Sequence, residues 1–347
     1  MESSIKRLVR PNILALQPYT CARNEYSGEA RAWLDANENS MIAGLNRYPD
    51  PLQIEVKKRL GAMRGVGVEN IFLGVGSDEC IDIIYRTFCR PGVDNVVAID
   101  PTYGMYSVCA AINDVEYRPV KLRADFSIDE EALFSAVDEN TKVLWICSPN
   151  NPTGNAFPPE QLRRIASRFS GITVVDEAYV DFSPLGSMVP ELEALPRLIV
   201  MQTFSKAWAS AAMRLGIAYA HPCIIGIFNN VKYPYNINIL TQREALRVLD
   251  SADEVARVAH CLVSERERLA ESLRSLPVVK KVYPSDANFL LVATTDADGL
   301  YAYLRDRGVI VRNRTRVTLC AGCLRVTVGT PEENALLLDV IAAFHAE

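Results

Sequence analysis

Lys206 is the first candidate for chemistry in this sequence, because an apolar run that is typical of a buried strand leads to it. The run covers Leu198–Val200, and the hydroxyl residues Thr203 and Ser205 precede the lysine. Lysine is rarely buried without a task, and in a partly dry pocket its pKa falls, so its amine can form a Schiff base with an aldehyde. The two hydroxyls and the guanidinium of Arg214 suit a phosphate.

An aldehyde beside a phosphate indicates pyridoxal 5'-phosphate (PLP), a cofactor that enzymes bind through a lysine. The segment around Lys206 therefore predicts a PLP site. A lysine at a helix start, with an unrelated surface arginine nearby, is the alternative interpretation of the same residues.

The composition is that of an ordinary globular protein with a large core. The chain has 347 residues, of which 49% are hydrophobic and 23% charged, enough for two domains or one large domain with a smaller companion. The formal net charge is -5 and no basic block stands out, so we expect no nucleic-acid partner. We see neither a membrane-length apolar run nor a signal-peptide core, and we therefore expect a cytoplasmic protein with no membrane partner.

The nine cysteines are an odd number and follow no disulfide spacing, which indicates reduced thiols. The one close pair is Cys320 and Cys323, a CxxC without a second pair beside it. Such a pair is a weak signal for zinc or redox chemistry, so we predict no metal site.

Strand and helix patterns alternate through the first two thirds of the chain. The apolar segments expected as strands are Ile71–Leu73, Val96–Ile99, Lys142–Cys147, Thr173–Val175, Leu198–Val200 and Gly216–Ala220. Uniformly apolar strands separated by helices predict a mostly parallel sheet covered on both faces, and such sheets bind ligands at the carboxyl ends of their strands. Asn151, Asp176 and Lys206 follow three of these ends, so an amide, a carboxylate and an amine should meet there.

Two helix starts carry signals of their own. Gly74–Glu79 leads into a helix whose apolar positions include Ile81 and Phe88, and its glycines offer backbone N–H groups to an anion. This segment is not the full dinucleotide fingerprint. Pro51 is expected in the first turn of a helix over Leu52–Met63.

The remainder of the chain predicts a smaller α+β unit. A helical stretch covers about Thr241–Leu276, and its charged face is interpreted as solvent-exposed. Strands are expected at Phe289–Val292, Val309–Val311 and Leu324–Val328, and helices near 298–307 and 332–344. The predicted organisation is an N-terminal arm over 1–30, a large domain over 31–240 and a small domain over 241–347.

Many short segments of the chain resemble one known family. They are LQPY (16–19), LDANEN (34–39), RYPDP (47–51), GSDE (76–79), PTY (101–103), SPNNPTG (148–154), VVDEAY (174–179), TFSKAW (203–208), RLG (214–216), VIVRN (309–313) and GCLRVTVGT (322–330). With these segments, in family order over almost the whole chain, the sequence resembles the class II PLP-dependent aminotransferases of the aspartate aminotransferase fold. The resemblance implies an α/β protein of PLP-dependent transferase fold type I, with a mostly parallel seven-stranded sheet in the large domain and a smaller α+β C-terminal domain.

The resemblance also implies roles for individual residues. Lys206 would hold PLP and move the proton between the substrate Cα and C4′ of the cofactor, Asp176 would keep the pyridine nitrogen protonated, and Tyr103 would stack on the ring. The implied cofactor-binding residues are Tyr48, Ser77, Asp78, Tyr103, Asn151, Asp176, Tyr179, Thr203, Ser205, Lys206 and Arg214. Tyr48 would reach the phosphate bound by the partner subunit, which implies a homodimer with shared sites.

Three of the segments, LDANEN, RYPDP and GCLRVTVGT, point to the histidinol-phosphate branch of the family and its near neighbours. The resemblance then implies reversible transamination between L-histidinol phosphate and 2-oxoglutarate, giving imidazole-acetol phosphate and L-glutamate, as a step of histidine biosynthesis. The implied substrate-binding residues are Tyr19 from the partner's arm, Asn37, Asn151, Arg312 and Arg325. Paired arginines that bind either a carboxylate or a phosphate would let one pocket accept both substrates.

Several alternatives stay open at this level. Arg312 could be a surface residue in an arginine-rich stretch with Arg314 and Arg316. The rival activities are an aromatic amino acid aminotransferase and a PLP-dependent decarboxylase of an O-phospho amino acid, and a non-catalytic PLP-binding regulator is a rival of another class. After Lys206 the chain reads AWASAAMRLG, where relatives more often carry a glycine, so the backbone of this loop is not predicted.

Overall fold

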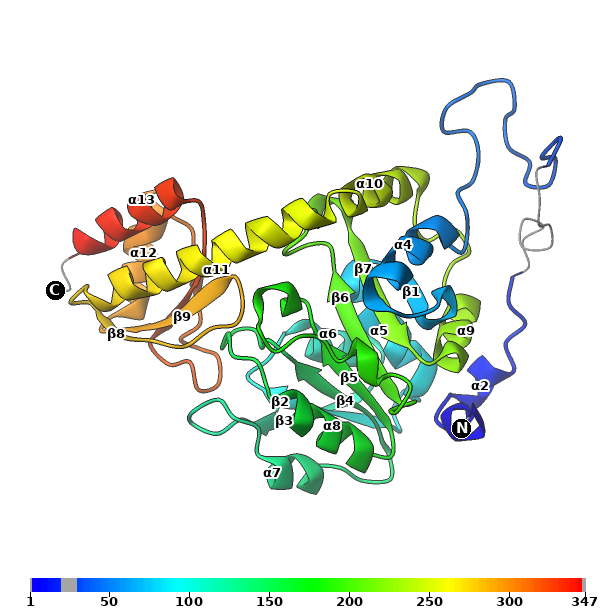
Figure 1. Ribbon diagram of the computed structural model, residues 1–347. Coiled ribbons are helices and arrows are strands. Elements are labelled where there is room, and N and C mark those ends of the chain that lie inside the picture. Colours follow the sequence, from blue (N-terminus) through cyan, green and yellow to red (C-terminus); the bar gives the residue numbers. More distant parts are fainter. Residues whose placement is uncertain (1, 20–29, 345–347) are drawn as a thin grey trace.

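The computed structural model describes residues 2–19 and 30–344 and contains two units of unequal size (Figure 1). A seven-stranded sheet covered by helices forms the large unit, and a four-stranded sheet with its helices forms the small one. The long helix α11 (Ala252–Arg274) runs from beside the large sheet to the small unit. Among the described residues, no helix combines the length and the apolar character needed to cross a membrane.

The large sheet is mostly parallel, as predicted. Its strands are β1 (Ile71–Val75), β2 (Asn95–Asp100), β3 (Glu116–Lys121), β4 (Thr141–Cys147), β5 (Ile172–Asp176), β6 (Leu198–Thr203) and β7 (Leu215–Ala220). They lie in the order β1-β7-β6-β5-β4-β2-β3, and only β7 runs antiparallel to its neighbours. The carboxyl ends of β4, β5 and β6 therefore meet at one edge of the sheet.

Helices cover both faces of this sheet because its strands are apolar on both. The helices of the large unit are α4 (Ile54–Arg64), α5 (Gly76–Phe88), α6 (Met105–Ile112), α7 (Glu130–Ser135), α8 (Pro159–Arg168), α9 (Pro222–Val231) and α10 (Ile239–Leu249), with short 3-10 turns between some of them. Neighbouring strand residues alternate between two buried clusters, with Phe72 and Trp145 in one and Leu73 and Leu144 in the other. Such burial on both faces is the dominant favourable contribution to folding.

The small unit is antiparallel. Its strands are β8 (Val279–Val282), β9 (Phe289–Thr294), β10 (Arg312–Asn313) and β11 (Cys323–Thr327), in the order β10-β11-β9-β8, and its helices besides α11 are α12 (Ala297–Asp306) and α13 (Pro331–Ala342). A capping box between Thr330 and Glu333 begins α13. This unit has its own apolar cluster, centred on β9, β11 and the inner faces of the three helices.

The sequence patterns missed two strands, β3 and β8. The sequence of β3 is EYRPVK, in which polar residues and a proline replace the apolar run of a central strand. This composition suits an edge strand, and β3 pairs with β2 alone. β8 is also an edge strand, and its two central residues are exposed lysines.

Three predicted boundaries were wrong for local reasons. Pro51 precedes α4 instead of opening it, because the Asp50 carboxylate accepts the backbone N–H groups of Leu52 at 2.8 Å and Ile54 at 2.7 Å and fixes a turn there. The stretch predicted as one helix from Thr241 is divided into α10 and α11 by an interruption at residues 250–251. Residues 309–311 form no strand, because the turn after α12 ties the N–H of residue 309 to the carbonyl of Leu304.

The N-terminal residues begin as part of the large unit. Helices α1 (Glu2–Lys6) and α2 (Pro11–Leu14) lie beside α9, and Ile5 is fully buried. The domain limits stay predictions, and α10, placed just beyond the expected boundary at residue 240, packs on α4 of the large unit.

The close approach of β7 to the start of α5 generates a stability prediction. A Cβ at Gly216 would lie within 3.0 Å of backbone atoms of Gly76 and Ser77, so G216A must push the helix away. We expect G216A to lower the free energy of unfolding by about 1–3 kcal/mol in urea titrations. Gly226, inside α9 with open space around it, supplies the control, because G226A should be neutral or slightly stabilising. Equal stability of the two variants would contradict the packing argument.

Candidate active site

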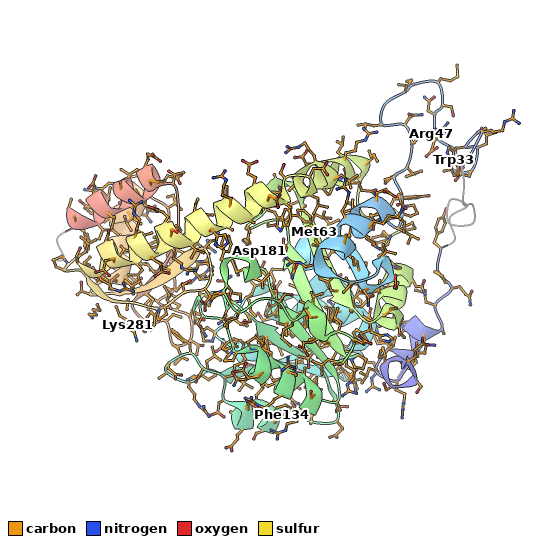
Figure 2. The ribbon with its side chains drawn as sticks, viewed as in Figure 1. Trp33, Arg47, Met63, Phe134, Asp181 and Lys281 are labelled. Carbon is orange, nitrogen blue, oxygen red and sulfur yellow. The ribbon has the colours of Figure 1, made fainter. Side chains whose placement is uncertain are left out.

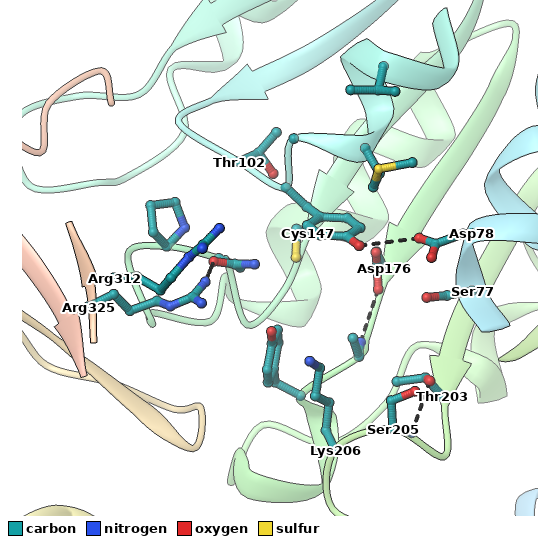
Figure 3. Close-up of a pocket in the computed structure, with 18 of the residues that line it drawn as sticks. Ser77, Asp78, Thr102, Cys147, Asp176, Thr203, Ser205, Lys206, Arg312 and Arg325 are labelled. Carbon is teal, nitrogen blue, oxygen red and sulfur yellow. Dashed lines mark hydrogen bonds between the residues drawn. The ribbon is translucent and has the colours of Figure 1, made fainter. Parts of the chain in front are cut away.

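A cavity of about 600 Å³ lies where the carboxyl ends of β4, β5 and β6 face the small unit (Figure 3). Twelve of the residues predicted from the sequence line it: Ser77, Asp78, Tyr103, Asn151, Asp176, Tyr179, Thr203, Ser205, Lys206, Arg214, Arg312 and Arg325. The structure thus brings together residues that are spread over about 250 positions of the chain.

Lys206 enters the cavity from the loop after β6, and its Nζ lies 5.5 Å from the centre of the Tyr179 ring. Burial lowers the pKa of this amine, and the positive charge of Arg325 lowers it further, while Asp176 opposes the shift. A larger fraction of the amine is therefore neutral and nucleophilic at a given pH than for a solvent-exposed lysine.

Asp176 ends β5 and is 3% exposed. Its carboxylate accepts the hydroxyl of Tyr106 at 2.6 Å and the backbone N–H of Ala178 at 3.1 Å. Burial raises the pKa of this carboxyl, although both hydrogen bonds favour the ionised form. A cationic or N–H group placed against Asp176 would offset the cost of burying its charge.

Tyr106 is a functional candidate that sequence reasoning missed. It is fully buried in α6 and stacks on Trp145 with ring centres 4.7 Å apart. The signal that could have found it is its position three residues after Tyr103, one helical turn away on the same side of the chain.

The start of α5 offers an anion site beside the lysine. No side chain caps this helix, so its first N–H groups at Ser77 and Asp78 face the cavity. Arg214 approaches so closely that a Cβ at Gly76 would lie 2.6 Å from its Nη2, and the same nitrogen lies 3.4 Å from the Asp78 carboxylate. Helix N–H groups, a guanidinium and the Ser205 hydroxyl form a donor set that fits a phosphate.

The loop after Lys206 has the backbone that glycine favours. Ala209 has φ 50° and Arg214 has φ 52°, both in the left-handed region. A glycine in this loop would adopt that conformation without a Cβ penalty.

Tyr103 and Asn151 occupy the side of the cavity formed by the loops after β2 and β4. The Tyr103 hydroxyl donates to Asp78 at 3.2 Å, and this placement fixes the ring above the cavity floor. The Asn151 carbonyl oxygen accepts from the guanidinium of Arg325, which joins the large unit to the small one across the cavity.

The small unit contributes arginines to the opposite side. Arg312 on β10 lies directly across from Arg325 on β11, and in Figure 3 both lie on the side away from Ser77 and Asp78. Arg312 therefore lines the cavity, although its strand is exposed. Arg314 also lines the cavity. The alternative interpretation of the sequence had placed Arg314 in an arginine-rich surface stretch.

Three predicted site residues lie outside this cavity. Tyr19 is 76% exposed, and Asn37 and Tyr48 line a separate cavity of about 410 Å³, where Tyr48 stacks on Tyr235 at 4.4 Å. Asn37 and Tyr48 belong to a segment that extends away from the large sheet, and Trp33 and Arg47 of this segment are labelled in Figure 2. The expected roles of Tyr19 and Tyr48 involve a second subunit, and these roles, like the substrate-binding role of Asn37, stay predictions.

Cys320 and Cys323 are buried free thiols in the small unit. Within residues 2–19 and 30–344, no cluster of three or more His, Cys, Asp or Glu side chains is arranged to hold a metal ion.

The lowered pKa of Lys206 gives a testable pH dependence. We expect its reaction with a small aldehyde, trapped by borohydride and located by mass spectrometry, to show a midpoint below the ordinary lysine value of about 10.4. In R325Q the midpoint should move up toward that value, because one of the three causes that lower the pKa of Lys206 is removed. A midpoint at the ordinary value in the unaltered protein would contradict the burial argument.

The contact of Tyr106 with Asp176 predicts a stability loss. Y106F removes a hydrogen bond to a charged group, so the free energy of unfolding at neutral pH should fall by about 1.5–3 kcal/mol in urea titrations. Tyr85 donates to the neutral carbonyl of Tyr106 at 2.8 Å, and Y85F should cost less, about 0.5–1.5 kcal/mol. The reverse order would show that Asp176 is not ionised in the folded protein.

Comparison with known proteins agrees with this geometry. The family described as aminotransferase class I and II matches residues 21–341. The chain is 50% identical to histidinol-phosphate aminotransferase of Parabacteroides distasonis, over 97% of this chain and 98% of the relative, and 50% identical to that of Bacteroides fragilis, over 98% and 99%. The structure of histidinol-phosphate aminotransferase from Sinorhizobium meliloti in complex with pyridoxal-5'-phosphate shares the fold, with a TM-score of 0.77 and 21% identity over 96% of both chains. The chain thus belongs to the class I and II aminotransferase family.

Proposed function

We propose that this chain is a PLP-dependent histidinol-phosphate aminotransferase. It exchanges an amino group between L-histidinol phosphate and 2-oxoglutarate, giving imidazole-acetol phosphate and L-glutamate, in histidine biosynthesis. The observation that carries the proposal is 50% identity to curated enzymes of that name over almost the whole chain, combined with a cavity that holds a lysine, a buried carboxylate and two separate groups of cationic donors.

The residues of the cavity fit PLP. The uncapped start of α5 and Arg214 would hold its phosphate, with Ser205 and Thr203 nearby. Lys206 would hold the cofactor covalently, Asp176 would face the pyridine nitrogen, and Asn151 and Tyr179 would bind the phenolic oxygen. When bound, PLP supplies an electron-accepting ring that stabilises negative charge at the substrate Cα.

The protein's own groups account for the proton transfers and for orientation. Lys206 Nζ takes the proton from the substrate Cα and returns one, a task suited to an amine whose pKa is lowered by burial. Asp176 would keep the pyridine nitrogen of the bound cofactor protonated, and the hydrogen bond from Tyr106 keeps the carboxylate in place. Tyr103 limits the space above the reacting atoms and, with its hydroxyl on Asp78, cannot swing away freely.

Arg312 and Arg325 receive the anionic group of the substrate. A guanidinium binds a carboxylate or a phosphate with the same pair of N–H groups, which explains how one pocket accepts glutamate and histidinol phosphate in turn. The anion-binding site of Arg312 and Arg325 lies across the cavity from the start of α5, so the substrate anion and the cofactor phosphate would not compete for one site.

We also propose that the protein is a homodimer and that it acts in the cytoplasm. The segment around Asn37 and Tyr48 supports the dimer. Its apolar side chains, Leu34, Met41, Ile42 and Leu45, are exposed in the single chain. A run of exposed apolar residues is typical of a protein–protein interface. In the dimer, Tyr19 and Tyr48 would complete the partner's site.

The rival activities use the same fold and differ in the substrate. An aromatic aminotransferase would act on L-phenylalanine, whose only anion is a singly charged carboxylate, whereas L-histidinol phosphate offers Arg312 and Arg325 a phosphate monoester with nearly two charges. A decarboxylase of an O-phospho amino acid would release CO₂ instead of passing an amino group to 2-oxoglutarate. A non-catalytic regulator would bind PLP and turn over neither substrate.

The test is turnover by the purified protein with L-histidinol phosphate, L-phenylalanine and an O-phospho amino acid as separate substrates. We expect 2-oxoglutarate-dependent turnover of L-histidinol phosphate, with kcat/KM at least about 10-fold above that for L-phenylalanine, because the carboxylate of the latter has fewer oxygens and less charge for charge-assisted hydrogen bonds to the arginines. K206A should lose this activity by at least about 100-fold, since general base catalysis alone contributes that much. Preferred turnover of L-phenylalanine, or CO₂ release, would replace the proposal with the matching rival.

A further inference from the structure

The side of the cavity formed by the small unit carries three arginines. Arg312 and Arg314 are two residues apart on an extended segment and therefore share a face. The backbone N–H of Arg314 donates to the carbonyl of Cys323 at 2.9 Å, which continues the pairing of β10 with β11 beyond Asn313. Arg325 lies across from Arg312 in this register, so the three guanidinium groups converge on one part of the cavity lining.

The arginine cluster is defined as Arg312, Arg314 and Arg325. Among residues 2–19 and 30–344, no carboxylate is one of the main groups that shift the pKa of Arg314 or Arg325. Arg325 donates to the amide of Asn151, which is uncharged. The Nε atoms of Arg314 and Arg325 are buried without a hydrogen-bond partner in the protein.

This arrangement is unfavourable unless an anion binds to it. Like charges directly opposite each other in a sheet destabilise it, and a buried donor without a partner costs free energy. Burial and the charges of Arg325 and Arg312 lower the pKa of Arg314 to about 10, so the three groups repel one another and Arg314 stays charged at neutral pH. An anion with two negative charges would offset this repulsion better than one with a single charge.

We propose that Arg314 is a specificity-determining residue that, with Arg312 and Arg325, selects a dianionic phosphate monoester over a monocarboxylate. This inference rests on the proposed function and deepens it by assigning a third cation to the substrate phosphate. A carboxylate group has two oxygens, which one bidentate guanidinium satisfies. A phosphate monoester has three terminal oxygens and nearly two charges at neutral pH, enough for three guanidiniums.

The test compares R314Q with R316Q in the PLP-loaded protein. Arg316 belongs to the same arginine-rich stretch but is exposed and lies outside the cavity lining, so it is a matched control. We expect R314Q to raise the KM for L-histidinol phosphate by about 10- to 100-fold, as the loss of one charge-assisted hydrogen bond predicts, and the KM for L-glutamate by less than about threefold. The kcat should change little, and R316Q should match the unaltered protein.

Equal increases in both KM values, no increase, or the same effect in R316Q would overturn the proposal.

Calorimetric titration with inorganic phosphate, and with acetate as a monocarboxylate probe, tests Arg314 without any turnover. R314Q should weaken phosphate binding by about tenfold or more and leave acetate binding nearly unchanged, and R314K should recover part of the phosphate affinity.

The two measurements separate the two claims. If the protein does not turn over L-histidinol phosphate but R314Q still weakens phosphate binding selectively, the proposed function fails and the assignment of Arg314 stands. If turnover occurs and phosphate binding is unaffected in R314Q, the assignment fails alone. If R314Q and R314K both have a lower melting temperature and lose affinity for phosphate and acetate equally, Arg314 has a structural role instead. This result would also overturn the assignment of Arg314.

Discussion

The burial of one carboxylate, Asp176, constrains the rest of the active site. A carboxylate at the end of a central strand has lost its water, so the surrounding structure has to supply donors. Tyr106 and the N–H of Ala178 supply two of them, and the stacked ring of Trp145 holds Tyr106 from behind. The remaining demand for a positive group is what makes the site suitable for a protonated ring nitrogen.

A second constraint is the contact between the start of α5 and the end of the loop after Lys206. Gly76 and Gly216 allow the helix start and β7 to touch, and this contact also places Arg214, because Arg214 immediately precedes β7. The result places helix N–H groups and a guanidinium at a fixed distance from the lysine loop. In the proposed function, backbone packing and not flexible side chains would thereby position the cofactor phosphate and the reactive amine.

Electrostatics divides the cavity into two anion sites. The donors from α5 and β7 belong to the large unit, whereas the arginine cluster belongs to the small one. Only the hydrogen bond between Arg325 and Asn151 joins the cluster to the loop after β4 among the contacts described here. The position of the small unit therefore determines whether the substrate anion and the reactive lysine are the right distance apart, and changes in that position would alter substrate binding more than cofactor binding.

The sequence by itself determined the strands of the large sheet other than β3, and the polar residues at or after the ends of β4, β5 and β6. Apolar runs such as Leu198–Val200 can be recognised as strands from the sequence, because a strand buried on both faces has no polar position to interrupt it. The edge strand β3 could not be predicted from the sequence, since an exposed strand tolerates polar residues and proline. Tertiary structure decided that Tyr106 supports Asp176 and that Arg314 lines the cavity, because both facts depend on which elements pack together. The segment with Asn37 and Tyr48 was recognisable in sequence, but in the proposed dimer its packing would depend on a second chain, which local sequence patterns do not specify.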